Sequence, residues 1–347
     1  MALRRSKRQS PGQPQPIIYR WDLDKTYLKS EFDSLRGLMR VPFEKPQDKV
    51  AVPGVAPLIR GLREVAVEAQ CEVRIYFISA SPPQIAKAIK EKLAMDGIEY
   101  DGIVFKNQLQ HLMRGKFRNL REHVGFKLTE LLKSRREMPP ESRELLFGDD
   151  WESDAIIYSL YADVLAGRIT AEDLDGILGP LGVDRRLIAL AKELAAAVAP
   201  ADVVRRIFIN IERRTPPKNF RAFGARLVPS FNYFQTAGCL FEEGHLTLPA
   251  VAAVAETLIG GSGYTPARLA NSLADIVRRG HLQSASAARL RDYLQTRDLL
   301  PERVSDGVRP SLWERLTSRF QRETPRAPAP AEVINYQRLI ADWRAAR

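Results

Sequence analysis

The sequence predicts an α/β fold in which a parallel sheet carries helices on both faces. From residue 17 to about residue 158, short runs rich in β-branched and aromatic residues alternate with segments of helical periodicity. Strands that are separated by helices favour a parallel sheet with helices on both of its faces. With 347 residues, 45% hydrophobic and 27% charged, the chain is a globular protein of one large domain with additions, or of two domains.

The expected elements begin at residue 16. The run PIIYRWDLD (16–24) is expected to form a buried strand because β-branched and aromatic residues dominate it. Segment 51–69 is expected to form a helix, with Leu58, Leu62 and Val65 on one apolar face. The next elements are expected to be a strand at 71–79, a helix at 82–97 opened by prolines and closed by glycine, a strand at 101–107, a helix at 126–137 that Lys127 opens, and a strand at 141–150.

After residue 167 two helices are expected before the strands resume. Thr170 and Asp173 form a capping-box pattern, and Asp184 can cap a second helix. Strands are expected at 205–212 and 225–231, followed by a helix at 232–244. The predicted organisation is a disordered basic tail (1–16), a main α/β domain (17–247) with a helical insertion (167–203), a helical extension (248–324), and a linker with a terminal helix (325–347).

Cysteine, histidine and hydropathy patterns exclude several protein classes. The two cysteines, Cys71 and Cys239, give neither a disulfide framework nor a zinc spacing, which favours a reducing cytoplasm. The four histidines are scattered. The first sixteen residues lack the apolar core of a secretory signal, and the longest apolar run, 246–261, is too short for a membrane span and contains Glu256.

The net charge of +11 is compatible with a polyanionic partner such as nucleic acid or an anionic membrane. The arginines are dispersed rather than gathered in one stripe, which favours ordinary solvated helix surfaces. Segment 114–123, with Phe117 among its basic residues, is either a cationic rim near the site or a solvated surface. Nucleic-acid binding is therefore only weakly indicated.

Polar residues gather where the expected strands end. In open parallel sheets, ligands bind at the carboxyl ends of the strands, so these residues are expected to share one crevice. The set, in chain order, is Asp22, Asp24, Ser79, Lys127, Asp149, Asp150 and Asp154.

This set suits phosphoryl transfer through a covalent intermediate. An ionised aspartate can attack phosphorus, and a second aspartate can protonate the leaving oxygen and later activate water. Because the phosphoester and the attacking carboxylate are both anionic, the attack requires a divalent cation, and carboxylate oxygens are ligands that Mg²⁺ prefers. A hydroxyl and a lysine can hold the charge of the phosphoryl oxygens.

The motifs resemble those of a known superfamily. DLDKT (22–26), a strand that ends in serine, a helical lysine and GDDWESD (148–154) resemble, in order, the four motifs of the haloacid dehalogenase superfamily. Within it, YFISASPPQI and LLFGDDWESDAIIY are similar to the catalytic domain of the actin-patch-type phosphatidate phosphatase family. The resemblance spans about residues 17–160, and more loosely 205–247. It implies a Rossmann-like sheet with little or no cap domain.

The resemblance also implies roles for the residues. Asp22 would be the nucleophile and Asp24 the general acid/base, with its carbonyl on the metal. Ser79 would bind the phosphoryl group, and Lys127 would stabilise its charge. A Mg²⁺ ion would be held by Asp22 and Asp149, with Asp154 in support. The sequence departs from that family at two positions: Lys25 stands where the family has an acidic residue, and Pro83 stands where it has tryptophan. These departures put the expectation of a lipid substrate in doubt.

Some assignments stay open at this point. Asp149 and Asp150 can exchange roles, or Asp150 can cap the following helix. Ser81 competes with Ser79. The rivals of Lys127 are Lys106, Lys116 and Lys133.

The segments between the motifs, 27–55 and 84–126, are too short for a full cap domain. An open site suits a bulky substrate: a phosphatidate-like lipid at a membrane surface, a nucleic-acid end or a phosphoprotein. The helical insertion or extension can partly roof the site instead. We therefore expect a Mg²⁺-dependent phosphomonoester hydrolase. The rivals are a catalytically silent binding module of the same fold, and a transferase or mutase, which would normally need a cap to exclude water.

Overall fold

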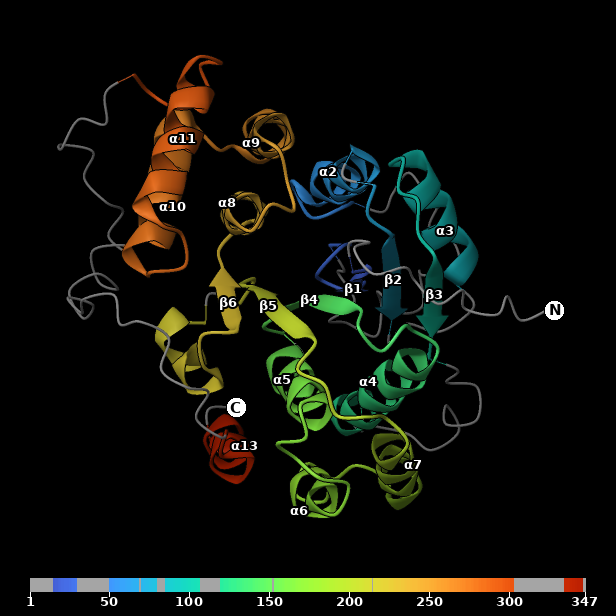
Figure 1. Ribbon diagram of the computed structural model, residues 1–347. Helices are drawn as coiled ribbons and strands as arrows, with labels where there is room; N and C mark the ends of the chain where they lie inside the picture. The colour runs from blue at the N-terminus through green and yellow to red at the C-terminus, as the bar shows by residue number, and fades with distance from the viewer. Residues whose placement is uncertain are drawn as a thin grey trace.

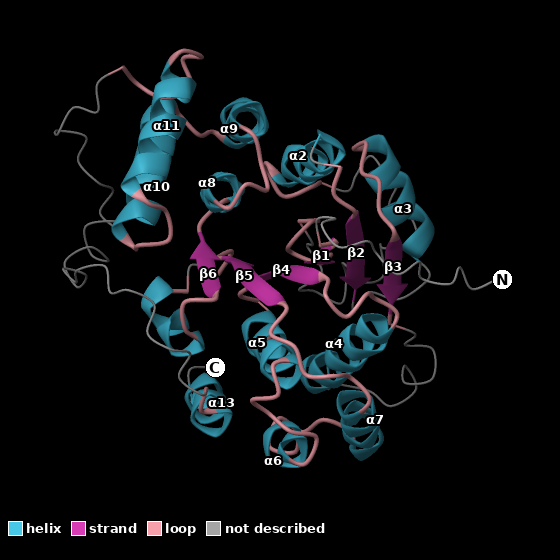
Figure 2. Cartoon of the chain, in the orientation of Figure 1, coloured by secondary structure: helices cyan, strands magenta, loops and turns pink. Residues whose placement is uncertain are grey.

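The protein folds around one six-stranded parallel sheet with helices on both faces, so the predicted fold class is confirmed (Figures 1 and 2). The computed structural model describes residues 15–29, 50–68, 70–79, 85–106, 119–151, 153–213, 215–302 and 334–345. The tail 1–14, most of segment 27–55, Ser81, Pro83, the basic segment up to residue 118 and the linker 325–331 lie outside the described residues.

The strand order places the first strand in the middle of the sheet. The order is β3-β2-β1-β4-β5-β6, and every pair is parallel. The chain runs from β1 outward to β3 and then returns to the other side of β1, which makes the gap between β1 and β4 the topological switch point. The strands are β1 (Ile17–Asp22), β2 (Val73–Ser79), β3 (Gly102–Phe105), β4 (Arg143–Asp149), β5 (Val204–Asn210) and β6 (Leu227–Ser230).

Two helical layers cover the sheet (Figure 1). One face carries α2 (Val55–Glu68), α3 (Ala86–Met95), α8 (Tyr233–Glu242) and α9 (Leu248–Ser262), and α10 (Pro266–Arg278) and α11 (Ser284–Gln295) pack on α8. The other face carries α4 (Asn119–Arg136) and α5 (Asp154–Leu165), with the 3-10 helix η4 (Pro217–Phe223) beside β6. Each face has its own hydrophobic core.

Residues 167–203 contain two helices, α6 (Asp173–Leu178) and α7 (Arg185–Ala196). Thr170 and Asp173 make the expected reciprocal cap, and Asp184 accepts from the backbone N–H of Arg186 at 2.8 Å. Helix α7 packs against α4, where a side chain in place of Gly125 would collide with Val183. The terminal helix α13 (Tyr336–Ala345) contacts α6, and the Tyr336 hydroxyl donates to Asp163 Oδ2 at 2.6 Å.

Successive side chains of β1 point to opposite faces of the sheet, so they contact different helical layers. Tyr19 and Trp21 belong to the core under α2 and α8. Trp21 stacks on Phe147 of β4 with ring centroids 3.8 Å apart. Successive side chains of a strand point to opposite faces, so Arg20 and Asp22 point toward α4 and α5.

Arg20 is held there by a buried ion pair. Its Nε lies 2.6 Å from Glu144 Oε2, and Glu144 also accepts from Arg135 of α4 and from the Tyr161 hydroxyl of α5. The pair therefore fixes β1 and β4 against both helices, and it orients the face on which Asp22 lies.

Helix α4 begins earlier than the sequence predicts. We expected it to start at residue 126 with Lys127, but it runs from Asn119, so Lys127 lies in its middle. Residues 119–125 are mostly polar and lack an apolar period, although Leu, Arg and Glu are good helix formers. The helical register puts Lys127 beside the buried Val124, Leu128 and Leu131.

Two partly buried histidines make the fold sensitive to acid. Burial lowers the pKa of His245 to about 4 and that of His281 to about 3, from 6.5. The unfolded chain therefore binds more protons below pH 6.5, and the free energy of unfolding falls as the pH drops through that range. His245 Nδ1 also lies 2.9 Å from the Tyr19 hydroxyl.

We expect His245→Gln to reduce this dependence, because glutamine keeps a polar partner for Tyr19 but takes up no proton. Urea unfolding at pH 7.5 and pH 5 checks it: the loss of unfolding free energy should be smaller in the variant than in the wild type. Equal losses would mean that His245 does not couple protonation to folding.

Candidate active site

Four aspartates lie together at the carboxyl ends of β1 and β4. Asp22 is the last residue of β1, Asp24 stands two residues further on, Asp149 ends β4, and Asp154 begins α5. Asp22, Asp149 and Asp154 are fully buried, and Asp24 nearly so. The topology therefore collects the carboxylates at the switch point of the sheet, where open α/β folds bind ligands.

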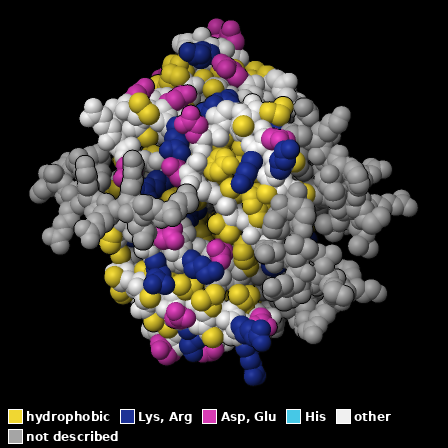
Figure 3. Space-filling model, turned by 90° about the vertical axis from the view of Figure 1, so that its right-hand side faces the viewer, with side chains coloured by type: hydrophobic (Ala, Val, Ile, Leu, Met, Phe, Trp, Pro, Cys, Tyr) yellow, Lys and Arg dark blue, Asp and Glu magenta, His cyan; other side chains and the backbone are white. Residues whose placement is uncertain are grey.

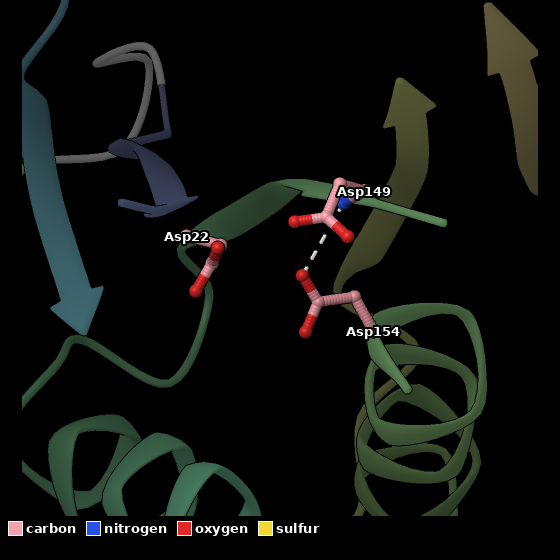
Figure 4. Close-up of side chains that lie close together, drawn as sticks. All are labelled: Asp22, Asp149 and Asp154. Carbon is pink, nitrogen blue, oxygen red and sulfur yellow. Dashed lines mark hydrogen bonds between the residues drawn. The ribbon is translucent and has the colours of Figure 1, made fainter. Parts of the chain in front are cut away.

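Three of these carboxylates converge on one point (Figure 4). Asp22, Asp149 and Asp154 each offer an oxygen, and these three oxygens all lie within 4.8 Å of one another. Asp154 Oδ2 also accepts from the backbone N–H of Asp149 at 3.3 Å, which is the contact drawn in Figure 4. Buried carboxylates repel one another and need compensating positive charge.

Lys127 supplies part of that charge. Its Nζ lies 2.7 Å from Asp22 Oδ1 and 2.6 Å from Asp154 Oδ1, and all three side chains are fully buried. One ammonium thus bridges β1 and α5 from the middle of α4. A single lysine cannot balance Asp22, Asp149 and Asp154, so the cluster has the charge and the hard oxygen donors that suit a divalent cation.

Gly148 allows Asp154 to approach β4. A Cβ atom at Gly148 would lie 2.4 Å from Asp154 Oδ2 and 2.6 Å from Asp154 Cβ. Any side chain at position 148 would therefore push Asp154 away from the cluster. Asp154 also lies in the first turn of α5, where the helix dipole favours a negative charge.

Two hydroxyl groups hold the turn after β1: that of Thr26, within the turn, and that of Tyr233, at the start of α8. Thr26 Oγ1 lies 3.4 Å from Asp22 Oδ2 and 3.4 Å from Asp149 Oδ2. The Thr26 carbonyl accepts from the hydroxyl of Tyr233, the first residue of α8, at 2.6 Å. Burial raises the pKa of Tyr233 well above its usual value, so this hydroxyl stays a donor. A residue more than 200 positions away thus fixes the loop of the first motif.

Asp24 and Ser79 form a second pair beside the cluster. Ser79 ends β2, and its Oγ donates to Asp24 Oδ2 at 2.8 Å. The Leu23 backbone N–H donates to the Ile78 carbonyl at 3.1 Å, which keeps the loop after β1 next to the end of β2.

Residues 21–171 match the family described as "Phosphatidate phosphatase APP1, catalytic domain". The predicted family resemblance is confirmed. The match covers somewhat less than half of the chain and includes every residue of the cluster. No curated protein and no solved structure matches the chain. Tyr233 and the other residues of α8 to α11 lie outside the segment that matches the APP1 catalytic domain.

Within the APP1-like segment, Asp150 lies apart from the cluster. Its Oδ1 accepts from the backbone N–H groups of Glu212 and Arg213, at 2.8 and 2.9 Å, and its Oδ2 accepts from that of Thr215 at 3.2 Å. The Asp150 carboxylate therefore holds the loop after β5, while the neighbouring Asp149 points to Asp22.

Two of the rival lysines are described. Lys133 pairs with Glu130 on the exposed side of α4. Lys106 is buried directly after β3, and its backbone N–H donates to the Ser79 carbonyl at 3.0 Å, so it lies beside the end of β2. Ser81 and Lys116 lie outside the described residues.

Thr26, Tyr233 and Trp151 were not among the site residues predicted from the sequence. The threonine had a signal, because it stands in the first motif, DLDKT. Trp151, whose N–H donates to Asp149 Oδ1 at 2.6 Å, stands inside the fourth motif, GDDWESD. No signal in the sequence indicated Tyr233, since only the folded topology brings its hydroxyl to the first motif.

Proposed function

We propose that this protein is a Mg²⁺-dependent phosphomonoester hydrolase that forms an aspartyl-phosphate on Asp22 and acts on a phosphatidate-like lipid. The convergence of Asp22, Asp149, Asp154 and Lys127 at the switch point carries the proposal. The APP1 family match supports a phosphatase activity and a phosphorylated lipid as substrate. Among the described helices, none has both the length and the hydropathy needed to cross a bilayer.

The metal would be held by Asp22, Asp149 and Asp154. Their donor set fits Mg²⁺, since three buried carboxylates face one lysine. When bound, the ion would offset the negative charge of the phosphoryl group and of the attacking carboxylate. Asp150 is left out of the proposed ligand set because three backbone N–H groups occupy its carboxylate.

The residues would divide the two half-reactions between them. In the first, an oxygen of Asp22 bonds to phosphorus, the bond from phosphorus to the ester oxygen breaks, and Asp24 gives its proton to that oxygen. In the second, water gives a proton to Asp24 and attacks phosphorus, and the bond to Asp22 breaks to release inorganic phosphate. Ser79 would hold the Asp24 carboxylate and bind a phosphoryl oxygen, and Lys127 would orient Asp22.

The experiment that tests the proposal measures phosphate release from p-nitrophenyl phosphate and from phosphatidate in detergent micelles, with Mg²⁺ and with a chelator. We expect turnover of both esters that requires Mg²⁺. Turnover that persists after complete chelation would contradict the metal-dependent reaction. Turnover of p-nitrophenyl phosphate without turnover of phosphatidate would contradict the lipid substrate but not the chemistry.

The different surroundings of Asp149 and Asp150 give a prediction about metal affinity. Asp149→Asn should raise the Mg²⁺ concentration needed for half-maximal activity about 10- to 100-fold, because it removes a ligand charge. Asp150→Asn should raise it less than about 3-fold, since its carboxylate faces the loop after β5. Magnesium titrations of activity check both values, and a larger effect of Asp150→Asn would reverse the assignment.

A further inference from the structure

The side chain of Tyr233 joins the first motif to helices that lie outside the segment matched by the APP1 family. It is buried, and its hydroxyl donates to the Thr26 carbonyl at 2.6 Å. Its ring lies beside that of Trp21, with centroids 6.0 Å apart, and a Cβ atom added to Gly54 would lie 3.3 Å from Tyr233 Cβ. Tyr233 therefore packs against β1 and against the residues before α2, in addition to its bond with the turn after β1.

The turn after β1 contains strained backbone that its surroundings must hold. Lys25 has a φ of +60°, a left-handed conformation that is unfavourable for residues other than glycine. Such a conformation persists only where the surrounding structure determines it. Inside the turn, the Leu28 N–H donates to the Leu23 carbonyl at 2.9 Å. Among the described residues no backbone N–H donates to the Thr26 carbonyl, so the Tyr233 hydroxyl supplies the hydrogen bond of that peptide group.

Thr26 connects this turn to the carboxylate cluster. Its Oγ1 lies 3.4 Å from Asp22 Oδ2 and 3.4 Å from Asp149 Oδ2. A hydroxyl has one proton, so it donates to one of these oxygens at a time. Both distances are long for such a bond, and a small shift of the turn would break one contact or both. The position of the Thr26 peptide therefore determines how Asp22 is held.

A buried polar network fixes the start of α8, from which Tyr233 projects. Asn232 caps the helix by accepting from the Gln235 N–H at 3.0 Å, and its Nδ2 donates to Ser272 Oγ of α10 at 2.8 Å. Gln235 donates to the Ser272 carbonyl at 2.9 Å and accepts from Arg279 Nη2 at 3.0 Å. Buried networks whose members are hydrogen-bonded make a structure rigid. Helix α10 thus holds Tyr233 in place relative to the first motif.

We propose that Tyr233 is a positioning residue of the phosphatase reaction, because it places the Thr26 hydroxyl between Asp22 and Asp149 and so orients Asp22 for attack on phosphorus. The inference rests on the proposed function. It assigns to α8 and α10, which lie outside the match to the APP1 catalytic domain, a part in the catalytic unit of this chain. Tyr233 acts through Thr26 and is not itself a catalytic residue.

The variant Tyr233→Phe tests the inference because it removes only the hydroxyl. With p-nitrophenyl phosphate and Mg²⁺, we expect kcat to fall about 10- to 100-fold and KM to change less than about 3-fold. Misplacement of a reacting group slows the reaction, whereas no contact with the substrate is lost.

The matched control is Tyr336→Phe. The Tyr336 side chain is equally buried, and its hydroxyl donates at the same distance, 2.6 Å, to Asp163 Oδ2, near the opposite end of α5 from Asp154. The control loses the same group but should keep the wild-type kcat. An unchanged kcat in Tyr233→Phe, or an equal fall in both variants, would overturn the inference.

A double-variant cycle tests the route through Thr26. Thr26→Val removes the hydroxyl that contacts Asp22 and Asp149 and leaves the carbonyl that Tyr233 binds. If Tyr233 acts through Thr26, kcat of the double variant should lie within about 3-fold of that of the slower single variant, because residues that act as a unit are not additive. Losses that multiply would overturn this route.

Hydrogen exchange separates the inference from its premise, since it needs no turnover. In the metal-free protein, the peptide that contains residues 22–28 should exchange about 3- to 10-fold faster in Tyr233→Phe than in the wild type, as for the loss of one hydrogen bond that closes the turn. Tyr336→Phe should leave that peptide unchanged. If the wild type hydrolyses no phosphoester, the proposed function fails and exchange alone decides: faster exchange supports a positioning role for Tyr233, and unchanged exchange overturns it.

Discussion

Asp22→Asn is expected to lower Mg²⁺-dependent phosphate release by about 10⁴-fold or more, which is the scale of losing a covalent nucleophile. An amide oxygen is a poor nucleophile, and the substitution also removes one charge from the proposed metal site. The change is nearly isosteric, so the hydrogen bond from Thr26 can persist. Steady-state rates with p-nitrophenyl phosphate measure the effect.

Asp175→Asn serves as the matched control, because Asp175 is exposed on α6, where it pairs with Lys192. The control should retain wild-type rates. A well-folded Asp22→Asn protein with more than about a tenth of the wild-type rate would contradict a nucleophilic role for Asp22.

Lys127→Met is expected to damage stability and activity together. The lysine is fully buried between Asp22 and Asp154, and its removal leaves two buried carboxylates without their partner. Breaking a buried ion pair in this way costs about 3–5 kcal/mol of unfolding free energy. Chemical unfolding in the absence of divalent cations measures this cost.

Mg²⁺ should restore part of the lost stability, because the ion would take over the neutralisation of the carboxylates. We therefore expect Mg²⁺ to raise the unfolding temperature of Lys127→Met more than that of the wild type. The control is Lys133→Met on the same helix, whose side chain is 46% exposed and pairs with Glu130. A Lys127→Met protein as stable as this control, with no response to Mg²⁺, would contradict the charge-balancing role.

The strands could be predicted from the sequence because local composition determines them. Each of the six strands falls within or within one residue of a short apolar run; most of these runs are rich in β-branched and aromatic residues, while that of β4 contains two leucines and a phenylalanine, and the alternation with helices indicated a parallel sheet. The parallel topology then brings strand ends together, which is why Asp22 and Asp149 could be placed in one crevice before their distance was known.

The predictions were weaker where contacts depend on tertiary structure. The start of α4 was placed seven residues too late, because residues 119–125 have no apolar period. The different orientations of Asp149 and Asp150 depend on the loop after β5, about 60 residues away. Tyr233 reaches Thr26 only in the folded protein, where its ring lies beside Trp21 of β1 with centroids 6.0 Å apart, and no local pattern encodes that contact.

The most direct test of the account is to trap the proposed covalent intermediate. The protein is mixed with p-nitrophenyl phosphate and Mg²⁺, quenched in acid within the first turnovers and treated with borohydride, which reduces an aspartyl-phosphate to homoserine. The account predicts that peptide mass spectrometry finds homoserine at position 22, only in samples that received substrate. Reduction at a different aspartate, or phosphate release without any reduced residue, would contradict Asp22 as the nucleophile.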